Sequence, residues 1–347
     1  MKPELDQPMM PTTTPFAAIA AGDIRELPET AALPRSWHQW SQAEIDALML
    51  AYAAGRPLLV RGEPGTGKTQ LARAAADCLG WRLHAETIHP RFEPQELLAR
   101  FDAVLRLADA QAQVKLDNHR YWRPGVLWKA YGWASAQPFL VEAERLADPA
   151  GHVVLIDEID KADSDLPNSL LEVLAQRSFQ VEPVAAPIGG PGVMPPLIVI
   201  TTNEERELPA AFLRRCIVLS LAPEGDYRDW LVGRGRAHFG ALAGVEGREQ
   251  ALLDDAVLDE AADQLVADRA AVSALNLVPP GLAEYLDLLQ ALHELFAGEN
   301  AAKRRSAQLA WLNRLSAYGY LKHAVDDTQH PAHQRSQAAL RRAAGSA

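Results

Sequence analysis

The sequence predicts a doubly wound α/β domain followed by a smaller all-α domain. Two patterns lead to this prediction. Short, continuously apolar runs separated by helical patterns occupy the first two thirds of the chain, and such runs are typical of strands buried on both faces of a parallel sheet. After about Pro223 these runs stop, and residues 226–322 show helical spacing alone. Strands alternating with helices, followed by helices, indicate two domains.

Four apolar runs predict strands, and the patterns around them predict helices. The strands are expected at Leu58–Val60, Val153–Ile156, Leu197–Ile200 and Ile217–Leu219. The helices of the first domain are expected at Ser41–Ala54, Thr69–Leu79, Pro94–Leu107, Leu166–Gln176 and Pro209–Arg215. Ser41 stands three residues before Glu44, the spacing of a capping box, so the first helix is expected to begin there.

Changes in composition divide the chain into four expected regions. Residues 1–35 are rich in Pro, Thr and Ala without sustained periodicity, so we expect a loosely ordered N-terminal segment. The α/β domain is expected over residues 36–223 and the α-helical domain over residues 224–325. Residues 326–347 are polar and rich in Gln, Ala and Arg, so we expect a polar tail.

The composition also limits the classes of partner. The 347-residue chain has 45 acidic and 34 basic residues and a formal net charge of −11, which argues against electrostatic binding to nucleic acid or to an anionic membrane. No stretch approaches the roughly 18 apolar residues of a membrane span, and the N-terminus does not resemble a signal peptide. Cys78 and Cys216 form no disulfide or metal pattern and are expected to be buried in a reducing compartment. We therefore expect a cytoplasmic protein without membrane contact or direct nucleic-acid binding.

A phosphate-binding loop is predicted between the first strand and the helix that follows it. The pattern G-x-x-x-x-G-K-[ST] is filled by Gly62, Glu63, Pro64, Gly65, Thr66, Gly67, Lys68 and Thr69. The glycines let the backbone approach phosphate oxygens, Lys68 is expected at the β- and γ-phosphates, and the Thr69 hydroxyl is expected on Mg²⁺. These eight residues and Gln70 are the candidate nucleotide-binding residues. The alternative is a glycine-rich turn with an incidental lysine, but the strand before the loop and the helix after it favour the phosphate loop.

A second candidate site lies where an apolar strand ends in acids. The run His152–Ile156 is followed directly by Asp157 and Glu158. A carboxylate at the end of a buried strand is costly unless a cation stands opposite, and a nucleotide-bound Mg²⁺ meets that need. Asp157 is then expected to hold Mg²⁺, and Glu158 to polarise the attacking water. The alternative is an acidic helix N-cap region. Taken with the loop, the acids indicate hydrolysis as well as binding.

From about Leu58 to Leu221 the chain resembles the AAA+ ATPases, and within them the MoxR-like group. Leu197–Asn203 resembles the sensor-1 strand of that family, which implies that Asn203 positions the lytic water. The alternative is an ordinary turn asparagine. The MoxR-like features are the stretch from Arg91–Leu98 to Tyr121–Leu127 and the stretch from Asp157 to Glu172. The resemblance implies a parallel sheet of five strands with an all-α lid, and ATP and Mg²⁺ as cofactors.

The segment Leu208–Cys216 resembles the part of AAA+ proteins that carries an arginine finger. Arg215 matches the finger position best and Arg214 second; such a residue reaches the site of a neighbouring subunit. The alternative is a surface arginine pair at a helix end. The lid departs from the family pattern, because the stretch 277–287 has no basic residue at its helix start. We assign no sensor-2 residue, and Arg269 is the nearest earlier arginine.

The resemblance implies an ATPase that assembles as a homo-oligomeric ring, expected to be a hexamer, and remodels or activates a partner protein in a chaperone-like way. A von Willebrand factor A-domain protein is the expected partner. The insert between about Phe101 and Arg120 is expected to face the pore or the partner, with an ordinary surface helix and loop as the alternative. Two other functions stay open: a GTP-using motor subunit related to the McrB type, and a nucleotide-gated scaffold or switch in a bacterial defence or stress system.

Overall fold

The computed structural model describes residues 15–30, 35–145, 148–163, 165–182, 184–223, 225–242, 250–320 and 330–345. Residues 1–14 and 31–34 of the expected N-terminal segment, and residues 326–329 and 346–347 of the expected tail, lie outside them. The chain separates into two compact units. The first comprises residues up to 27, 40–62 and 67–220, and the second comprises residues 28–39, 63–66 and those from 221 onward.

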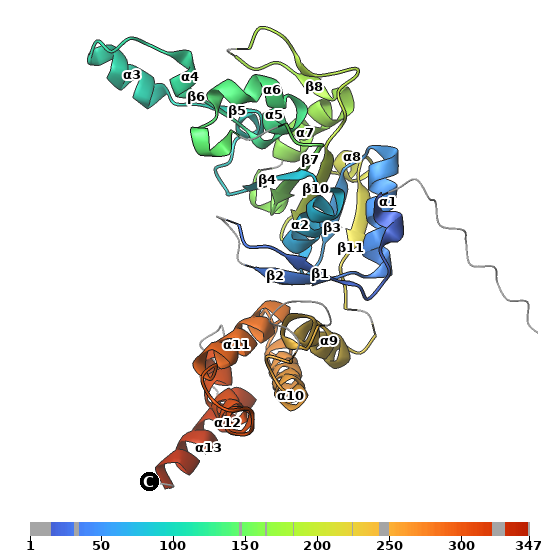
Figure 1. The fold of residues 1–347 in the computed structure, drawn as a ribbon, viewed down its shortest axis with the longest axis vertical. Coiled ribbons are helices and arrows are strands. Elements are labelled where there is room, and N and C mark those ends of the chain that lie inside the picture. The colour runs from blue at the N-terminus through green and yellow to red at the C-terminus, as the bar shows by residue number, and fades with distance from the viewer. Residues whose placement is uncertain are drawn as a thin grey trace, which may run out of the picture. The chain divides into compact units, whose positions relative to one another are not determined.

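A parallel sheet of five strands forms the centre of the first unit (Figure 1), which confirms the predicted fold class. Its order is β11-β3-β10-β7-β4, and every neighbouring pair is parallel. The strands are β3 (Leu58–Arg61), β4 (Arg82–Thr87), β7 (His152–Asp157), β10 (Leu197–Thr202) and β11 (Ile217–Ser220). All six residues of β10 are buried, as expected for a central strand covered on both faces.

Strand β4 is the one strand of this five-stranded sheet that no apolar run predicts. Its sequence is Arg-Leu-His-Ala-Glu-Thr, and it pairs only with β7 at the edge of the sheet. An edge strand is less buried than a central one, so it needs no continuous run of apolar residues. Hydrogen bonds to β7 place it, and these depend on a residue pairing across about 70 positions of sequence.

The helix predicted over Pro94–Leu107 is wrong. This region contains a short 3₁₀ helix at Pro94–Leu97, strand β5 (Ala99–Phe101), and helix α3 (Ala103–Gln111). β5 pairs antiparallel with β6 (Trp122–Pro124), and this pairing across the insert replaces the helical turn that the local pattern favours. Asp102 then starts α3 as its N-cap, where its side chain accepts a hydrogen bond of 2.8 Å from the N–H of Leu105.

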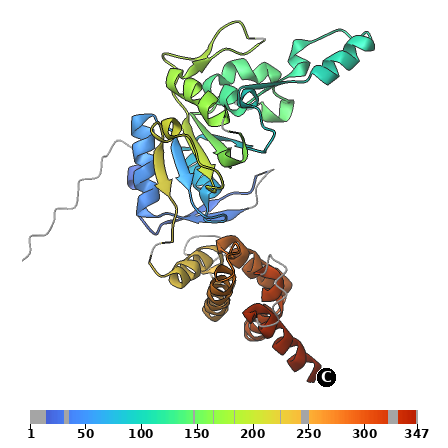
Figure 2. The ribbon, with the colours of Figure 1, turned by 180° about the vertical axis from the view of Figure 1, so that it is seen from behind.

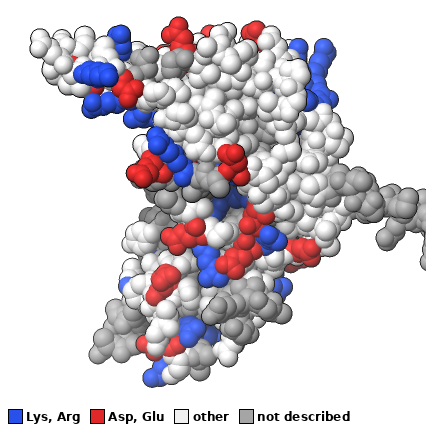
Figure 3. All heavy atoms as spheres, turned by 45° about the horizontal axis from the view of Figure 1, so that its top comes forward, with Lys and Arg blue, Asp and Glu red and all other residues white. Residues whose placement is uncertain are grey.

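The insert is a hairpin with β5 and β6 at its base and α3 and α4 (Asn118–Tyr121) at its far end. Figures 1 and 2 show α3 and α4 projecting from the rest of the first unit. Two apolar side chains of α3 are exposed, Val104 by 80% and Leu107 by 60%. Residues 99–124 carry five basic and three acidic side chains in a chain of net charge −11, and blue side chains gather on this projection in Figure 3.

Helices cover the sheet and fill the core of the first unit. The remaining helices are α1 (Gln42–Ala54), α2 (Lys68–Leu79), α5 (Val126–Tyr131), α6 (Trp133–Ala136), α7 (Asp165–Gln176) and α8 (Ala210–Leu213). The capping box that predicts the start of α1 is confirmed, because Ser41 Oγ accepts from the N–H of Glu44 at 3.3 Å and Glu44 Oε2 accepts from the N–H of Ser41 at 2.7 Å. Sheet residues Leu59, Val154 and Ile200 pack in one cluster with buried residues of α5 and α7.

Several short elements complete the description. They are the 3₁₀ helices at Pro15–Ala18, Gln137–Phe139, Glu142–Glu144 and Ile159–Lys161, with strands β1 (Ile24–Leu27), β2 (Ser36–Gln39), β8 (Ser178–Phe179) and β9 (Ile188–Gly189). Strand β8 pairs antiparallel with β9. Within the described ranges, none of the helices combines the length and hydropathy that a membrane-spanning segment requires.

The elements described from residue 225 onward are helices, which the sequence predicts for the lid up to residue 325, whereas the last helix lies in the expected polar tail. They are α9 (Tyr227–Phe239), α10 (Asp255–Ser273), α11 (Leu282–Leu295), α12 (Ala301–Gly319) and α13 (Pro331–Gly345). Leu258 and Leu265 of α10, Tyr285 and Leu289 of α11 and Leu312 of α12 are fully buried together. The helical spacing in this region therefore reflects a core of its own.

Candidate nucleotide site

The phosphate loop joins the end of β3 to the first turn of α2. Gly65 and Gly67 have φ values of 79° and 98°, in the left-handed region that favours glycine. Gly67 is the N-cap of α2, so the backbone N–H groups of the first turn lie at the loop. Lys68 and Thr69 open the helix, followed by Gln70. This geometry favours glycine at Gly67, a fixed position of the motif, and at Gly65, one of its variable positions.

Lys68 is buried close to several carboxylates. Its side-chain amine donates a hydrogen bond of 2.8 Å to the carbonyl oxygen of Gly62, and the residue is 7% exposed. Burial lowers the pKa of Lys68, and the nearby carboxylates of Asp157, Asp160 and Glu158 oppose that shift. One ammonium group thus stands among an excess of negative charge.

Thr69 and Asp157 meet as the sequence analysis expects of magnesium ligands. The Thr69 hydroxyl lies 3.1 and 3.2 Å from the two oxygens of the Asp157 carboxylate. Thr201 of β10 donates a second hydroxyl hydrogen bond to Asp157, at 2.5 Å. Carboxylate and hydroxyl oxygens are hard ligands, so the donor set fits Mg²⁺. The strand order explains the contact of Thr201, because β10 is the neighbour of β7 in the sheet.

Glu158 and Asn203 also lie together, although 45 residues separate them in sequence. The side-chain N–H of Asn203 donates to Glu158 Oε1 at 3.3 Å. The backbone of Glu158 is in the left-handed region, with φ of 60°, and its N–H donates to the Thr201 hydroxyl at 2.9 Å. A non-glycine residue in this conformation is strained, and such strain is frequent where a side chain has to be aimed.

Asp160 is a residue of the site that the sequence analysis missed. Its carboxylate is 2% exposed and accepts from the backbone N–H of Asn203 at 3.4 Å and of Glu205 at 3.0 Å. It therefore holds the turn that carries Asn203. The sequence offers a sign of this role, since Asp160 is the third acid of the Asp-Glu-Ile-Asp run. Its hydrogen-bond partners Asn203 and Glu205, however, follow a different strand, β10.

The two finger candidates lie elsewhere on the first unit. Arg214 is the C-cap of α8 and Arg215 follows it; both are exposed. Arg215 donates to the carbonyl oxygen of Ala211 at 3.3 Å. The guanidinium of Arg56 donates to the carbonyl oxygen of Arg215 at 3.1 Å and also to that of Arg214. Within the described part of the chain, the hydrogen bonds of Arg214 and Arg215 named above include none of the residues around Lys68, so the structure does not bring these groups together.

Residues 63–66 of the loop group with the second unit. Thr66 donates through its hydroxyl to the carbonyl oxygen of Glu63 at 2.9 Å, and Pro64 lies between them. Arg269 of α10 contacts both oxygens of the Glu63 carboxylate, at 2.6 and 2.9 Å. Its guanidinium also donates to the carbonyl oxygen of Pro280 at 3.0 Å. The arginine nearest to the expected sensor-2 stretch therefore contacts the loop through Glu63, a contact that no motif indicates.

Comparisons with known proteins agree with the motifs. Residues 57–216 match the family described as AAA domain (dynein-related subfamily). The comparison with curated proteins gave no match. Among solved structures, a Cytophaga hutchinsonii protein assigned as an ATPase is similar with a TM-score of 0.38 and 16% identity, over 64% of this chain and 57% of that one.

Two point mutants of RuvB from Thermotoga maritima are also similar. One has a TM-score of 0.36 and 17% identity, over 72% of this chain and 68% of that one. The other has a TM-score of 0.42 and 16% identity, over 78% of this chain and 66% of that one. The chain thus covers between 57 and 68% of the length of these three proteins. Residues 57–216, which carry the phosphate loop, the acidic strand end and Asn203, are therefore similar to the AAA domain of the dynein-related subfamily.

Proposed function

We propose that the chain is a MoxR-like AAA+ ATPase that hydrolyses ATP with Mg²⁺ in a ring oligomer and thereby remodels or activates a partner protein. One observation carries the proposal: Thr69 and Asp157 meet at 3.1 Å beside the Asn203–Glu158 pair at 3.3 Å. A cation-binding pair next to an oriented carboxylate is the arrangement that nucleotide hydrolysis needs.

The residues divide the work in a way that their contacts support. Bound Mg²⁺ would neutralise charge on phosphate oxygens, and Thr69 and Asp157 would hold it. Lys68 would leave the Gly62 carbonyl and place its ammonium group at the phosphates. The Glu158 carboxylate would polarise the attacking water and accept its proton, and Asn203 would keep that carboxylate in position.

The ring and the shared site rest on the exposed arginines. A guanidinium can stabilise the negative charge that develops in the transition state of a neighbouring site. Arg215 is the finger in this proposal, with Arg214 second, and both are exposed at the end of α8. A hexameric ring would place them at the adjacent protomer.

The partner and the location are also part of the proposal. The projecting hairpin exposes Val104 and Leu107, which gives a partner such as a von Willebrand factor A-domain protein an apolar contact. Cytoplasmic location agrees with the thiols of Cys78 and Cys216, which are free.

The test is ATP turnover per subunit as a function of protein concentration, with the Arg215→Ala variant measured in parallel and Lys115→Ala as an exposed-cation control. A shared site predicts a steep rise with concentration that Arg215→Ala abolishes and Lys115→Ala preserves. Turnover that is independent of both concentration and Arg215 would contradict the ring. Measuring GTP beside ATP separates the proposal from the GTP-using motor, and turnover that stays very low throughout would favour the switch.

A further inference from the structure

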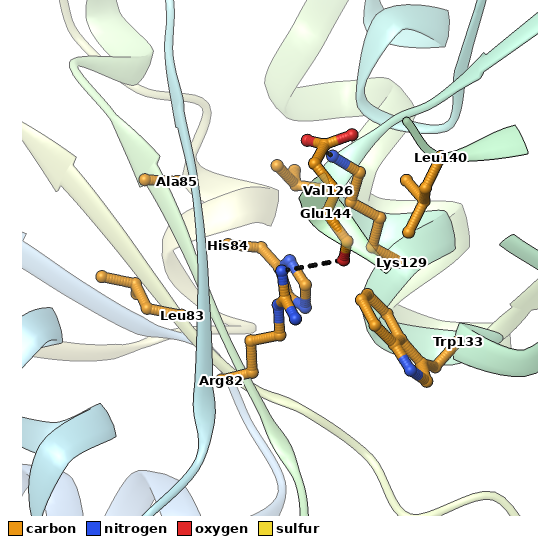
Figure 4. Close-up of a pocket in the computed structure, with 9 residues that line it drawn as sticks. All are labelled: Arg82, Leu83, His84, Ala85, Val126, Lys129, Trp133, Leu140 and Glu144. Carbon is orange, nitrogen blue, oxygen red and sulfur yellow. Dashed lines mark hydrogen bonds and ion pairs between the residues drawn. The ribbon is translucent and has the colours of Figure 1, made fainter. Parts of the chain in front are cut away.

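A second cavity in the first unit lies at the opposite end of β4 and β7 from the phosphate loop. Its volume is about 180 Å³, and it is bounded by the first residues of β4, by α5 and α6, and by Leu140 and Glu144 (Figure 4). His152, beside this end, and Asp157 are five residues apart on β7, which corresponds to roughly 16 Å of extended strand. The cavity is therefore separate from the nucleotide site.

Two cations line the cavity, and the described lining residues include one carboxylate. Lys129 of α5 lies 3.3 Å from Glu144 Oε1, and its side chain is 21% exposed. The guanidinium of Arg82 donates at 3.3 Å to the backbone carbonyl of Glu144, not to its carboxylate, and stacks 4.6 Å from the ring of Trp133. Figure 4 shows Arg82 and Lys129 directed toward the same space. The lining therefore carries one more positive than negative charge.

The histidines at this end add no charge. His84 is 7% exposed and its Nε2 lies 2.9 Å from Nδ1 of His152. The pKa of His84 is lowered to about 3. Burial is the largest cause, and the nearby charges of His152, Arg82 and Lys129 add to it. The imidazole is neutral at pH 7, and the excess positive charge belongs to Arg82 and Lys129. The positive potential that disfavours a second proton on His84 also favours an anion.

The remaining lining limits the size and character of a ligand. A volume of about 180 Å³ is below the roughly 300–1,000 Å³ of pockets that hold drug-sized ligands, so the cavity suits a small ligand. Val126 and Leu140 give one apolar wall, and both are nearly fully buried. A ligand with a charged end and a short apolar part would satisfy both sides.

We propose that this cavity binds a small organic oxyanion, with its charged group between Arg82 and Lys129 and its short carbon chain against Leu140 and Val126. A carboxylate and a phosphate group share this chemistry, because both accept hydrogen bonds from a guanidinium and an ammonium group. Val126 and Lys129 of α5 line the cavity, and one residue joins α5 to strand β6 of the hairpin.

The test measures binding of inorganic phosphate and of propionate to the full chain by isothermal titration calorimetry. The variants Arg82→Gln and Lys129→Gln remove one cation each, and Leu140→Trp narrows the cavity from its apolar wall without removing charge. Lys115→Gln, an exposed cation on the hairpin, is the matched control for lost charge. Lys68→Ala shows whether a probe binds at the phosphate loop instead.

We expect at least one probe to bind, and each of the three cavity variants to weaken it about 10-fold or more, since hydrogen bonds to charged groups are strong. Lys115→Gln and Lys68→Ala should leave the affinity unchanged. Preference for phosphate or propionate identifies the charged group. Absence of binding by both probes at 20 mM, loss of binding in Lys68→Ala, or full affinity in the cavity variants would overturn the proposal. Circular dichroism spectra of each variant, recorded at the temperature of the titration, distinguish loss of binding from loss of folding.

Discussion

The two ends of strand β7 have opposite surpluses of charge. At its carboxyl end, the buried ammonium group of Lys68 stands among Asp157, Glu158 and Asp160. At its amino end, neutral His152 and His84 stand beside the cations that line the second cavity. Only four apolar residues, 153–156, separate these environments, and all are buried. One strand can thus border two sites of opposite charge, because its middle residues are apolar and buried and its polar residues lie at its two ends.

The difference in charge indicates which kind of ligand each end of β7 can bind. The acids at the carboxyl end repel one another unless a divalent cation joins them, and such a cation accompanies a nucleotide. The cations at the amino end have one carboxylate and a carbonyl oxygen between them, so the proposed oxyanion would balance the charge there. Substitutions at either end should therefore change different measurements.

The largest effect is expected from Lys68→Ala at the carboxyl end. The variant loses the ammonium group that faces the phosphates, so affinity for ATP should fall about 100-fold or more. Isothermal titration calorimetry with ATP and Mg²⁺ measures this, with Lys129→Ala as the matched control at the amino end. Unchanged affinity in Lys68→Ala would contradict the site assignment.

Glu158→Gln should separate binding from hydrolysis at the same end. The amide keeps the shape of the carboxylate but accepts no proton from water, so turnover should fall between ~10²- and 10⁴-fold while ATP still binds. Phosphate release under saturating ATP measures the loss. Undiminished release would show that Glu158 does not act on the water.

Asp160→Asn tests whether the buried acid positions Asn203. The variant weakens the hydrogen bonds from the N–H groups of Asn203 and Glu205, so the turn should shift and turnover should fall about 10- to 100-fold. ATP affinity should change little, because Asp160 is not in the phosphate loop. Loss of affinity equal to the loss of turnover would assign Asp160 a role in binding instead.

The smallest effect is expected at the amino end, in the pH dependence of stability. The pKa of His84 is lowered to about 3 in the folded chain, so the unfolded chain binds a proton first as the pH falls below about 6.5. His84 therefore contributes full stability at neutral pH, and this is lost between pH 6.5 and 3 at up to about 1.4 kcal/mol per pH unit.

Urea unfolding at pH 7, 6 and 5 measures this loss, and His84→Gln supplies the comparison because glutamine does not titrate. The stability difference between wild type and variant should shrink toward pH 5. A His84 resonance that titrates near pH 6.5 in the folded protein would contradict the expected sign and size.

The sequence predicted the parts of the fold that depend on local pattern. Continuous apolar runs identify β3, β7 and β10 because central strands of a parallel sheet are buried on both faces, and the edge strand β11 carries a similar run. The phosphate loop and the acidic strand end are readable because each is a contiguous run whose chemistry depends on its own residues. The helical spacing after residue 225 likewise reports a buried face.

Other features follow only from contacts between distant segments. β4 is a strand because β7 pairs with it, and the predicted helix over Pro94–Leu107 is replaced because β5 pairs with β6. Local pattern carries no information about such hydrogen-bond partners.

The two ends of the sheet show the same contrast between what the sequence predicts and what the tertiary structure decides. By itself the sequence predicted a nucleotide site at Lys68, Thr69, Asp157 and Glu158, because each of the two motifs is a contiguous run. The tertiary structure alone decided that Asp160 holds the Asn203 turn and that Arg82 and Lys129 share a cavity. The physical reason is that these residues lie between 43 and 47 positions apart, and only the pairing and packing of the folded chain bring their side chains within reach.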